Sequence, residues 1–123
     1  METLREEDMK ISSDMIWKVW AKGEIFAGND PVFWRKDACG AWIFRGHYGR
    51  QDSEYGWVID HIKPMAKDDE DAVSNLRPLQ WENTMRKTDG SLECRVTSTG
   101  VHNDKPLENN TVIEPVNMYI MNY

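Results

Sequence analysis

The sequence predicts a single α+β domain, and three observations support this prediction. A stretch of apolar residues at helical spacing follows the polar N-terminus, at residues 14–22. A continuous apolar run at residues 57–59 is typical of a strand, and a second short run at residues 76–79 is typical of another. A helical segment at residues 80–88 follows and is stopped by an Asp-Gly pair. The centre of the chain is therefore expected to form a strand, a loop, a second strand and a helix.

The remaining elements are predicted from local signals. A serine or aspartate at positions 12–14 is expected to cap the N-terminal helix, and Gly23 to end it. Residues 41–44 are expected to form another strand, which could pair with residues 57–60 as an antiparallel hairpin over a long connection. Residues 92–98 alternate only loosely, so the structural signal weakens there.

The length of 123 residues corresponds to one domain. We expect a flexible N-terminus at residues 1–13, a central domain at residues 14–90, and a C-terminal extension at residues 91–123 that packs on the same domain. The chain contains no apolar run near the length of a membrane span, and its acidic N-terminus lacks the apolar core of a signal peptide. Cys39 and Cys94 lie far apart and lack metal-ligand spacing, so we expect free thiols in a cytoplasmic protein.

The formal net charge of −6 argues against a protein that binds nucleic acid through a broad basic face. The charge is uneven, however, because residues 35–50 carry a local balance of +3. From this charge we expect either a weak intrinsic affinity for nucleic acid or a partner protein that delivers the substrate.

The polar residues of the central unit suggest a chemistry. Asp60 offers a carboxylate oxygen and Asn83 an amide oxygen, which are the hard ligands that Mg²⁺ prefers. His61 is the natural proton acceptor near neutral pH. Lys87 lies one helical turn beyond Asn83, where a cation could hold a phosphate. Asp60 and His61 can serve one site only if the strand ends or twists between them, because adjacent strand residues point to opposite faces.

These residues resemble a known family. Asp60-His61, then Asn75, then Asn83 and Lys87 follow one another in the order and at the spacing of the HNH endonucleases, which have the ββα-metal fold. The flanking stretches that also resemble a small stand-alone branch of this family are Arg35-Lys36-Asp37-Ala38-Cys39-Gly40 and Tyr55-Gly56-Trp57. The resemblance covers residues 16–90.

The resemblance implies a metal-dependent endonuclease that hydrolyses the phosphodiester bonds of DNA, with RNA left open as a substrate. His61 would be the general base that activates water, and Asn75 would brace the loop between the strands. Asp60 and Asn83 would hold one divalent ion, and Lys87 would stabilise developing charge. An asparagine at position 83 points to Mg²⁺ or Mn²⁺, and the absence of paired Cys-x-x-Cys ribbons argues against a structural zinc. The residues expected to contact nucleic acid are Arg45, Arg50, Arg77 and Arg86.

Other interpretations stay open at this point. His61 taken alone could be a structural histidine, and Arg77 suits an ion pair as well as a phosphate contact. The main rival function is a catalytically inactive module of the same fold that binds nucleic acid or a protein. A hydrolase of small phosphodiesters is a third. The acidic run at residues 68–71 lacks the spacing of a calcium loop, so we expect it to be a solvated loop.

Overall fold

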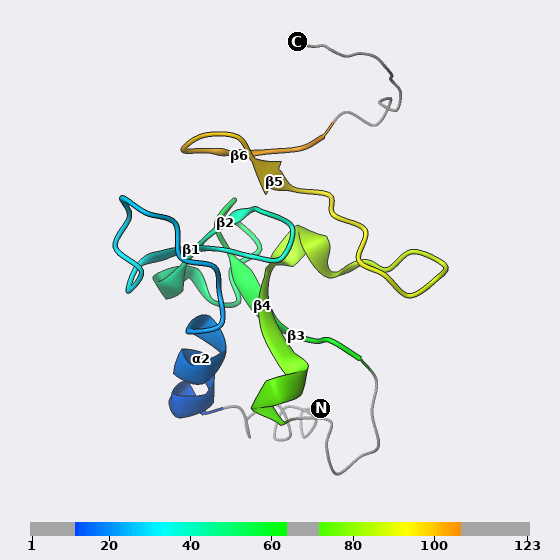
Figure 1. Cartoon of the computed structure of the whole chain (residues 1–123), viewed down its shortest axis with the longest axis horizontal. Helices are drawn as coiled ribbons and strands as arrows, with labels where there is room; N and C mark the ends of the chain where they lie inside the picture. The colour runs from blue at the N-terminus through cyan, green and yellow to red at the C-terminus, as the bar shows by residue number, and fades with distance from the viewer. Residues whose placement is uncertain (1–11, 64–71, 107–123) are drawn as a thin grey trace.

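The computed structural model describes residues 12–63 and 72–106. In this part of the chain it has one α-helix and three two-stranded antiparallel sheets, so the predicted α+β class is confirmed (Figure 1). The predictions for the N-terminal segment before residue 12, for the acidic loop at residues 68–71 and for the tail beyond residue 106 lie outside the described residues.

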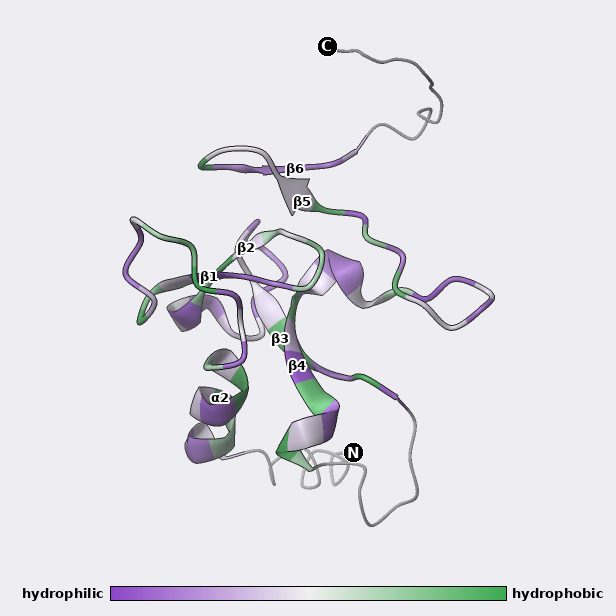
Figure 2. Ribbon diagram, viewed as in Figure 1, coloured by the Kyte–Doolittle hydropathy of each residue, from purple (hydrophilic) through white to green (hydrophobic). Residues whose placement is uncertain are grey.

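Helix α2 spans Ser13–Trp20, close to its predicted position. Ser12 is the N-cap, and its side-chain oxygen accepts a hydrogen bond from the Met15 N–H at 3.2 Å. That bond satisfies one of the donors that a helix start leaves without a partner. Val19 and Trp20 are buried. Figure 2 shows the hydrophobic side of the helix turned toward β4 and its hydrophilic side turned away.

The strands and 3₁₀ turns are short and follow one another along the chain. Strand β1 spans Trp34–Lys36, β2 Trp42–Phe44, β3 Trp57–His61, β4 Leu76–Gln80, β5 Thr97–Ser98 and β6 Asn103–Asp104. The 3₁₀ turns are η1 at Arg45–His47, η3 at Val73–Asn75 and η4 at Trp81–Thr84.

The predicted pairing of residues 41–44 with residues 57–60 is wrong. Strand β2 pairs with β1, and β3 pairs with β4. A tight turn joins β1 to β2, in which one Asp37 oxygen accepts hydrogen bonds from the N–H groups of Cys39 and Ala41. Gly40 has a φ of +83°, a conformation that glycine adopts without strain. The short loop costs less closure entropy than the long connection that we expected.

The predicted helix at residues 80–88 is also wrong. Turn η4 ends at Thr84, and Met85 is already extended. The chain then forms a small hairpin in which the Lys87 N–H donates to the Ser91 carbonyl at 2.8 Å and the Glu93 N–H donates to the Met85 carbonyl at 3.0 Å. Lys87 therefore does not lie on a helix face with the residue four positions before it.

A tryptophan pair forms the centre of the core. The rings of Trp20 and Trp57 lie 5.3 Å apart between centroids, and both side chains are fully buried. Val19, Ile43 and Leu76 complete this cluster. The core therefore joins α2 to β2, β3 and β4, and it fixes the position of the strand that carries Asp60 and His61.

The prediction of free thiols is wrong, because Cys39 and Cys94 form a disulfide. Cys94 lies in a segment that polar contacts hold against the turn after β1, for example through the Ser98 hydroxyl, which donates to the Gly40 carbonyl at 2.6 Å. The sequence separation gave no sign of this proximity. The prediction of a cytoplasmic location rested on free thiols and therefore loses that support. Within the ranges that the structure describes, none of the helices has the length and apolar character needed to cross a membrane.

Candidate functional site

Strand β3 carries Asp60 and His61 as its last two residues. In the antiparallel register Asp60 lies opposite Arg77 and His61 lies opposite Leu76, at the start of β4. The ladder continues through His61, so the strand does not end between the two residues. The end of this strand pair is the place where chemistry-bearing side chains gather.

Asn75 fastens the chain just beyond β3. Its side-chain oxygen accepts a hydrogen bond from the Lys63 N–H at 3.0 Å, and its amide nitrogen donates to the Lys63 carbonyl at 2.7 Å. The Asn75 carbonyl also accepts a bond from the Ile62 N–H at 2.7 Å. Asn75 is buried, so this pair of contacts is well shielded from water. These bonds fix the backbone at Lys63, two residues beyond His61, and the bracing role that the resemblance implies for Asn75 stays a prediction.

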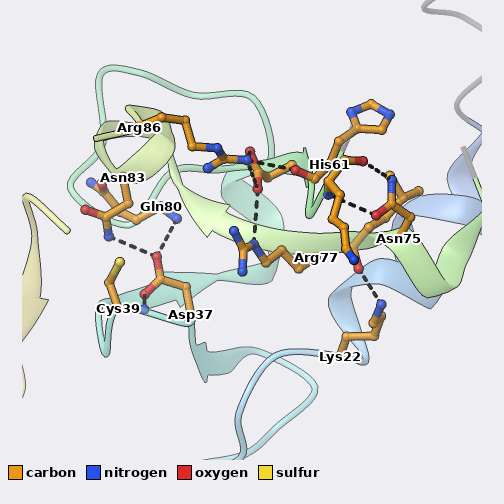
Figure 3. A network of polar contacts seen from close by, with 12 residues as sticks. Lys22, Asp37, Cys39, His61, Asn75, Arg77, Gln80, Asn83 and Arg86 are labelled. Atoms are coloured by element: carbon orange, nitrogen blue, oxygen red, sulfur yellow. Dashed lines mark hydrogen bonds and ion pairs between the residues drawn. The ribbon is translucent and has the colours of Figure 1, made fainter. Parts of the chain in front are cut away.

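Two guanidinium groups surround the Asp60 carboxylate (Figure 3). Arg77 Nε donates to Asp60 Oδ2 at 3.1 Å, and Arg86 Nη2 donates to the two carboxylate oxygens at 3.3 and 3.1 Å. Arg86 Nη2 also donates to the His61 carbonyl at 2.8 Å. The Asp60 side chain is only 10% exposed, so these charge-assisted bonds are little screened. Two cations against one carboxylate leave this spot with a net positive charge.

One donor of this group has no acceptor. Arg86 Nη1 is buried and makes no hydrogen bond to the residues that the structure describes. A buried donor without a partner is costly, and a ligand can reach this nitrogen only if the residues around it move. Arg86 was expected to contact nucleic acid, and its other nitrogen is committed to Asp60.

Asn83 lies elsewhere, in the core. Its amide nitrogen donates to Asp37 Oδ2 at 3.0 Å and to the Val96 carbonyl at 2.9 Å. Its oxygen accepts from the N–H groups of Arg95 and Val96, both at 2.8 Å. The side chain is fully buried. In Figure 3, Asn83 lies with Asp37 at one end of the polar network, and His61 lies at the other end.

Asp60 and Asn83, the two expected metal ligands, therefore do not form one site in which an ion finds oxygens free to bind it. Both oxygens of Asp60 accept bonds from arginines, and the oxygen of Asn83 accepts two backbone bonds. Across residues 12–63 and 72–106, no three His, Cys, Asp or Glu side chains are grouped to hold a metal. In this arrangement the residues do not fit the Mg²⁺ or Mn²⁺ ion that the resemblance implies.

The other expected site residues are dispersed. The Arg45 guanidinium lies 4.7 Å from the ring centroid of Trp17, where cation and aromatic face attract each other. Arg50 forms an exposed ion pair with Asp52. Lys87 is exposed in the hairpin that follows η4. Of the four arginines expected to contact nucleic acid, the structure brings together only the two that bind Asp60.

Asp37 is the residue that the sequence analysis did not single out. It is buried and accepts hydrogen bonds from Cys39, Ala41, Gln80 and Asn83. Burial raises the pKa of its carboxyl group, against the opposing effect of these four donors. Beside it, the disulfide joins the same turn to Cys94. Hydrogen bonds and a covalent link thus connect the turn after β1, turn η4 and the segment at residues 94–96. In the sequence, Asp37 stands two residues before Cys39, and Gln80 stands three residues before Asn83. Neither spacing is a known signal for a buried carboxylate that links these segments.

No protein-family model, no curated protein and no solved structure matches this chain. The function is therefore argued from the residues themselves and from the resemblance in the central motif.

Proposed function

We propose that this chain is an endonuclease that hydrolyses phosphodiester bonds of DNA, with His61 as the general base. The observation that carries the proposal is the β3–β4 pair, which ends in Asp60 and His61 and whose exit Asn75 holds through both backbone groups of Lys63. Such a strand pair is what the resemblance implies for the strand half of the ββα-metal arrangement. The neighbouring arginines supply the positive charge that a phosphate needs.

The proposed reaction requires a twist at the end of β3, so that His61 faces the same phosphate as the arginines bound to Asp60. His61 takes a proton from a water molecule, whose oxygen attacks phosphorus in line with the leaving 3′ oxygen. Arg77 and Arg86 stabilise the charge that develops on the phosphate oxygens, and Asp60 holds both guanidiniums in place until the substrate arrives. The bond between phosphorus and the 3′ oxygen breaks, the leaving oxygen takes a proton from solvent, and the products would be 5′-phosphate and 3′-hydroxyl ends, as the resemblance implies.

A divalent ion is not assigned a step here, because Asp60 and Asn83 do not form a common open site. Its requirement stays a prediction of the resemblance.

The test is plasmid cleavage by the purified full chain in EDTA, Mg²⁺, Mn²⁺, Ca²⁺ or Zn²⁺. We expect the wild type to nick or linearise DNA with Mg²⁺ or Mn²⁺, and His61→Ala to be at least about 100-fold slower. His102→Ala is the matched control, because His102 is an exposed histidine near the short β6 strand and should leave the rate unchanged. Cleavage by His61→Ala at the wild-type rate would refute the assignment of the base.

A second candidate function is favoured by a specific observation. Asp60 is bound by two arginines, and Asn83 is hydrogen-bonded to Asp37 and to the backbone of Val96. Because neither residue is free to bind an ion, the arrangement suits a module that binds nucleic acid or a protein without cutting. In that case all proteins would leave the plasmid intact with every ion, while the wild type would still retard DNA in EDTA. Loss of that retardation in an Arg77→Gln variant would place the binding at the β3–β4 end.

A further inference from the structure

A pocket of about 550 Å³ lies away from the residues of the proposed catalytic site. Its walls come from β1, from β2, from the turn around Phe26 and from the loop at residues 98–101 that joins β5 to β6. Figure 1 shows the β5–β6 hairpin lying next to β2. A pocket of this volume accommodates a ligand of nucleotide size.

Three aromatic side chains line the pocket. The rings of Phe26 and Trp42 lie 5.5 Å apart at 84°, and those of Trp34 and Trp42 lie 6.2 Å apart at 86°. Trp42, which is only 4% exposed, therefore forms a buried corner with each neighbour. Phe26 is 46% exposed, so a ligand can reach its face from solvent.

The central ring is held rigidly. Trp42 Nε1 donates to the Gly100 carbonyl at 2.6 Å, which ties the loop of the hairpin to the indole. The backbone N–H of Trp42 donates to Asn103 Oδ1 at 2.6 Å, and Asn103 Nδ2 donates to the Trp42 carbonyl at 3.0 Å. A pocket wall fixed in this way loses little entropy when a ligand binds beside it.

The charge in the pocket is positive. Lys36 Nζ lies 4.1 Å from the ring centroid of Phe26 and 4.8 Å from that of Trp42. The lining contains no carboxylate. A ligand cation would have to displace the Lys36 ammonium group from the aromatic faces, whereas an anionic ligand would be attracted by it. Aromatic faces with one cation and no acid suit a planar ring that carries a phosphate.

We propose that this pocket binds one nucleotide of single-stranded nucleic acid. The base stacks on the exposed Phe26 ring, and the Lys36 ammonium group moves from this ring to the phosphate. Stacking of this kind is tolerant of sequence, because every base has an aromatic face. It also supplies affinity that does not depend on a broad basic surface, which an acidic chain of net charge −6 lacks. The inference goes beyond the proposed cleavage and does not depend on it.

The test measures binding in EDTA, where a metal-dependent reaction cannot contribute. A short fluorescein-labelled oligothymidylate is titrated with the full chain, and anisotropy gives the affinity. We expect Phe26→Ala to weaken binding by about tenfold, and Lys36→Met to reduce the salt dependence by about one phosphate contact. Phe33→Ala is the matched control, since Phe33 is 42% exposed and lies outside the pocket. Near-ultraviolet circular dichroism shows whether each variant keeps its packing.

Each result decides the proposal. Unchanged affinity in a folded Phe26→Ala protein, or an equal loss in Phe33→Ala, would overturn it, as would a wild type that does not bind the oligonucleotide. Thymidine monophosphate that binds as tightly as the oligonucleotide would assign the pocket to free nucleotides instead. Displacement of the oligonucleotide by tetramethylammonium but not by thymidine monophosphate would assign it to an ammonium ligand. A protein that binds as expected but does not cut plasmid supports the pocket and counts against the nuclease.

Discussion

At the scale of single residues, Asp37 balances two opposing effects. Burial raises the pKa of its carboxyl group, and four N–H donors stabilise the charged form and lower it. Burial is the larger effect, so the folded protein holds a proton on Asp37 at a higher pH than the unfolded chain does. The contribution of Asp37 to stability is therefore fully present below the unfolded pKa and is lost as the pH rises through the folded pKa.

This sign gives a prediction. The free energy of unfolding of the wild type, minus that of Asp37→Asn, should grow as the pH falls from 7 toward 4. At neutral pH the variant should still be less stable, by about 3 kcal/mol, because an amide cannot accept from all the donors around it. Urea unfolding followed by tryptophan fluorescence measures both quantities. A difference that shrinks as the pH falls would mean that the hydrogen bonds outweigh burial.

Asn83 gives a second prediction at this scale. Asn83→Ala removes a buried amide that bonds the backbone at residues 95 and 96, so we expect a loss of about 3 kcal/mol in the free energy of unfolding. Thr84→Ala is the control, because Thr84 is exposed and should change stability by less than about 0.5 kcal/mol. Thermal unfolding distinguishes the two. Equal stability of both variants would remove the structural role of Asn83 and restore its candidacy as a metal ligand.

At the scale of elements, the hairpin after η4 replaces the helix of the predicted ββα unit. The Gly90 N–H donates to the Lys87 carbonyl at 2.9 Å, and Gly90 has a φ of +90°. This combination is typical of a hairpin loop that ends in a left-handed residue. The hairpin places Arg86 beside the Asp60 carboxylate. The helix predicted through residue 88 gave no reason to expect this contact.

The backbone of this turn can be tested. We expect Gly90→Ala to lower the free energy of unfolding by about 1 kcal/mol, because a residue with a Cβ is strained at this φ although the surrounding space is open. Gly100→Ala is the matched control, since its surroundings are equally open and its φ lies outside the left-handed region. It should be neutral or slightly stabilising. Equal losses in both variants would show that the effect does not come from the left-handed conformation.

Local signals predicted several elements well. Ser12 and the apolar spacing after it defined α2, and the apolar runs at residues 57–59 and 76–79 became β3 and β4. The antiparallel register of that pair then explains why Asp60 meets Arg77. These features depend on the residues themselves and on their near neighbours in sequence.

The failures depended on contacts between distant segments. The segment at residues 80–88 has helical spacing, but Asn83 is bonded to residues 95 and 96, and the chain turns back after Thr84 to reach them. An asparagine looks the same in sequence whether its oxygen faces an ion or a backbone N–H. Arg86 was expected to contact nucleic acid, and its attachment to Asp60 follows from the hairpin, which the sequence did not indicate.

At the scale of the whole molecule, polar and covalent links hold the C-terminal segment on the domain. The disulfide joins Cys39 to Cys94, and Asn103 bonds the backbone of Trp42 on both sides. Among the described residues beyond β4, Val96 is the only buried hydrophobic one, and it lies outside the tryptophan-centred cluster. The pocket wall at residues 98–101 therefore depends on these links more than on apolar burial.

The disulfide closes a loop with a sequence separation of 55, so its loss should release considerable entropy in the unfolded chain. We expect reduction to lower the free energy of unfolding by about 4 kcal/mol, on the loop-entropy estimate. Urea unfolding with and without a phosphine reductant measures this, and no other cysteine complicates the result. A Cys39→Ser, Cys94→Ser protein should reproduce the reduced curve without reductant. If both curves coincide with that of the oxidised protein, the hydrogen bonds of Asp37 and Asn83 suffice to hold the segment. If instead the reduced protein also loses binding of the oligonucleotide while α2 stays folded, the covalent link is what keeps the wall of the pocket in place.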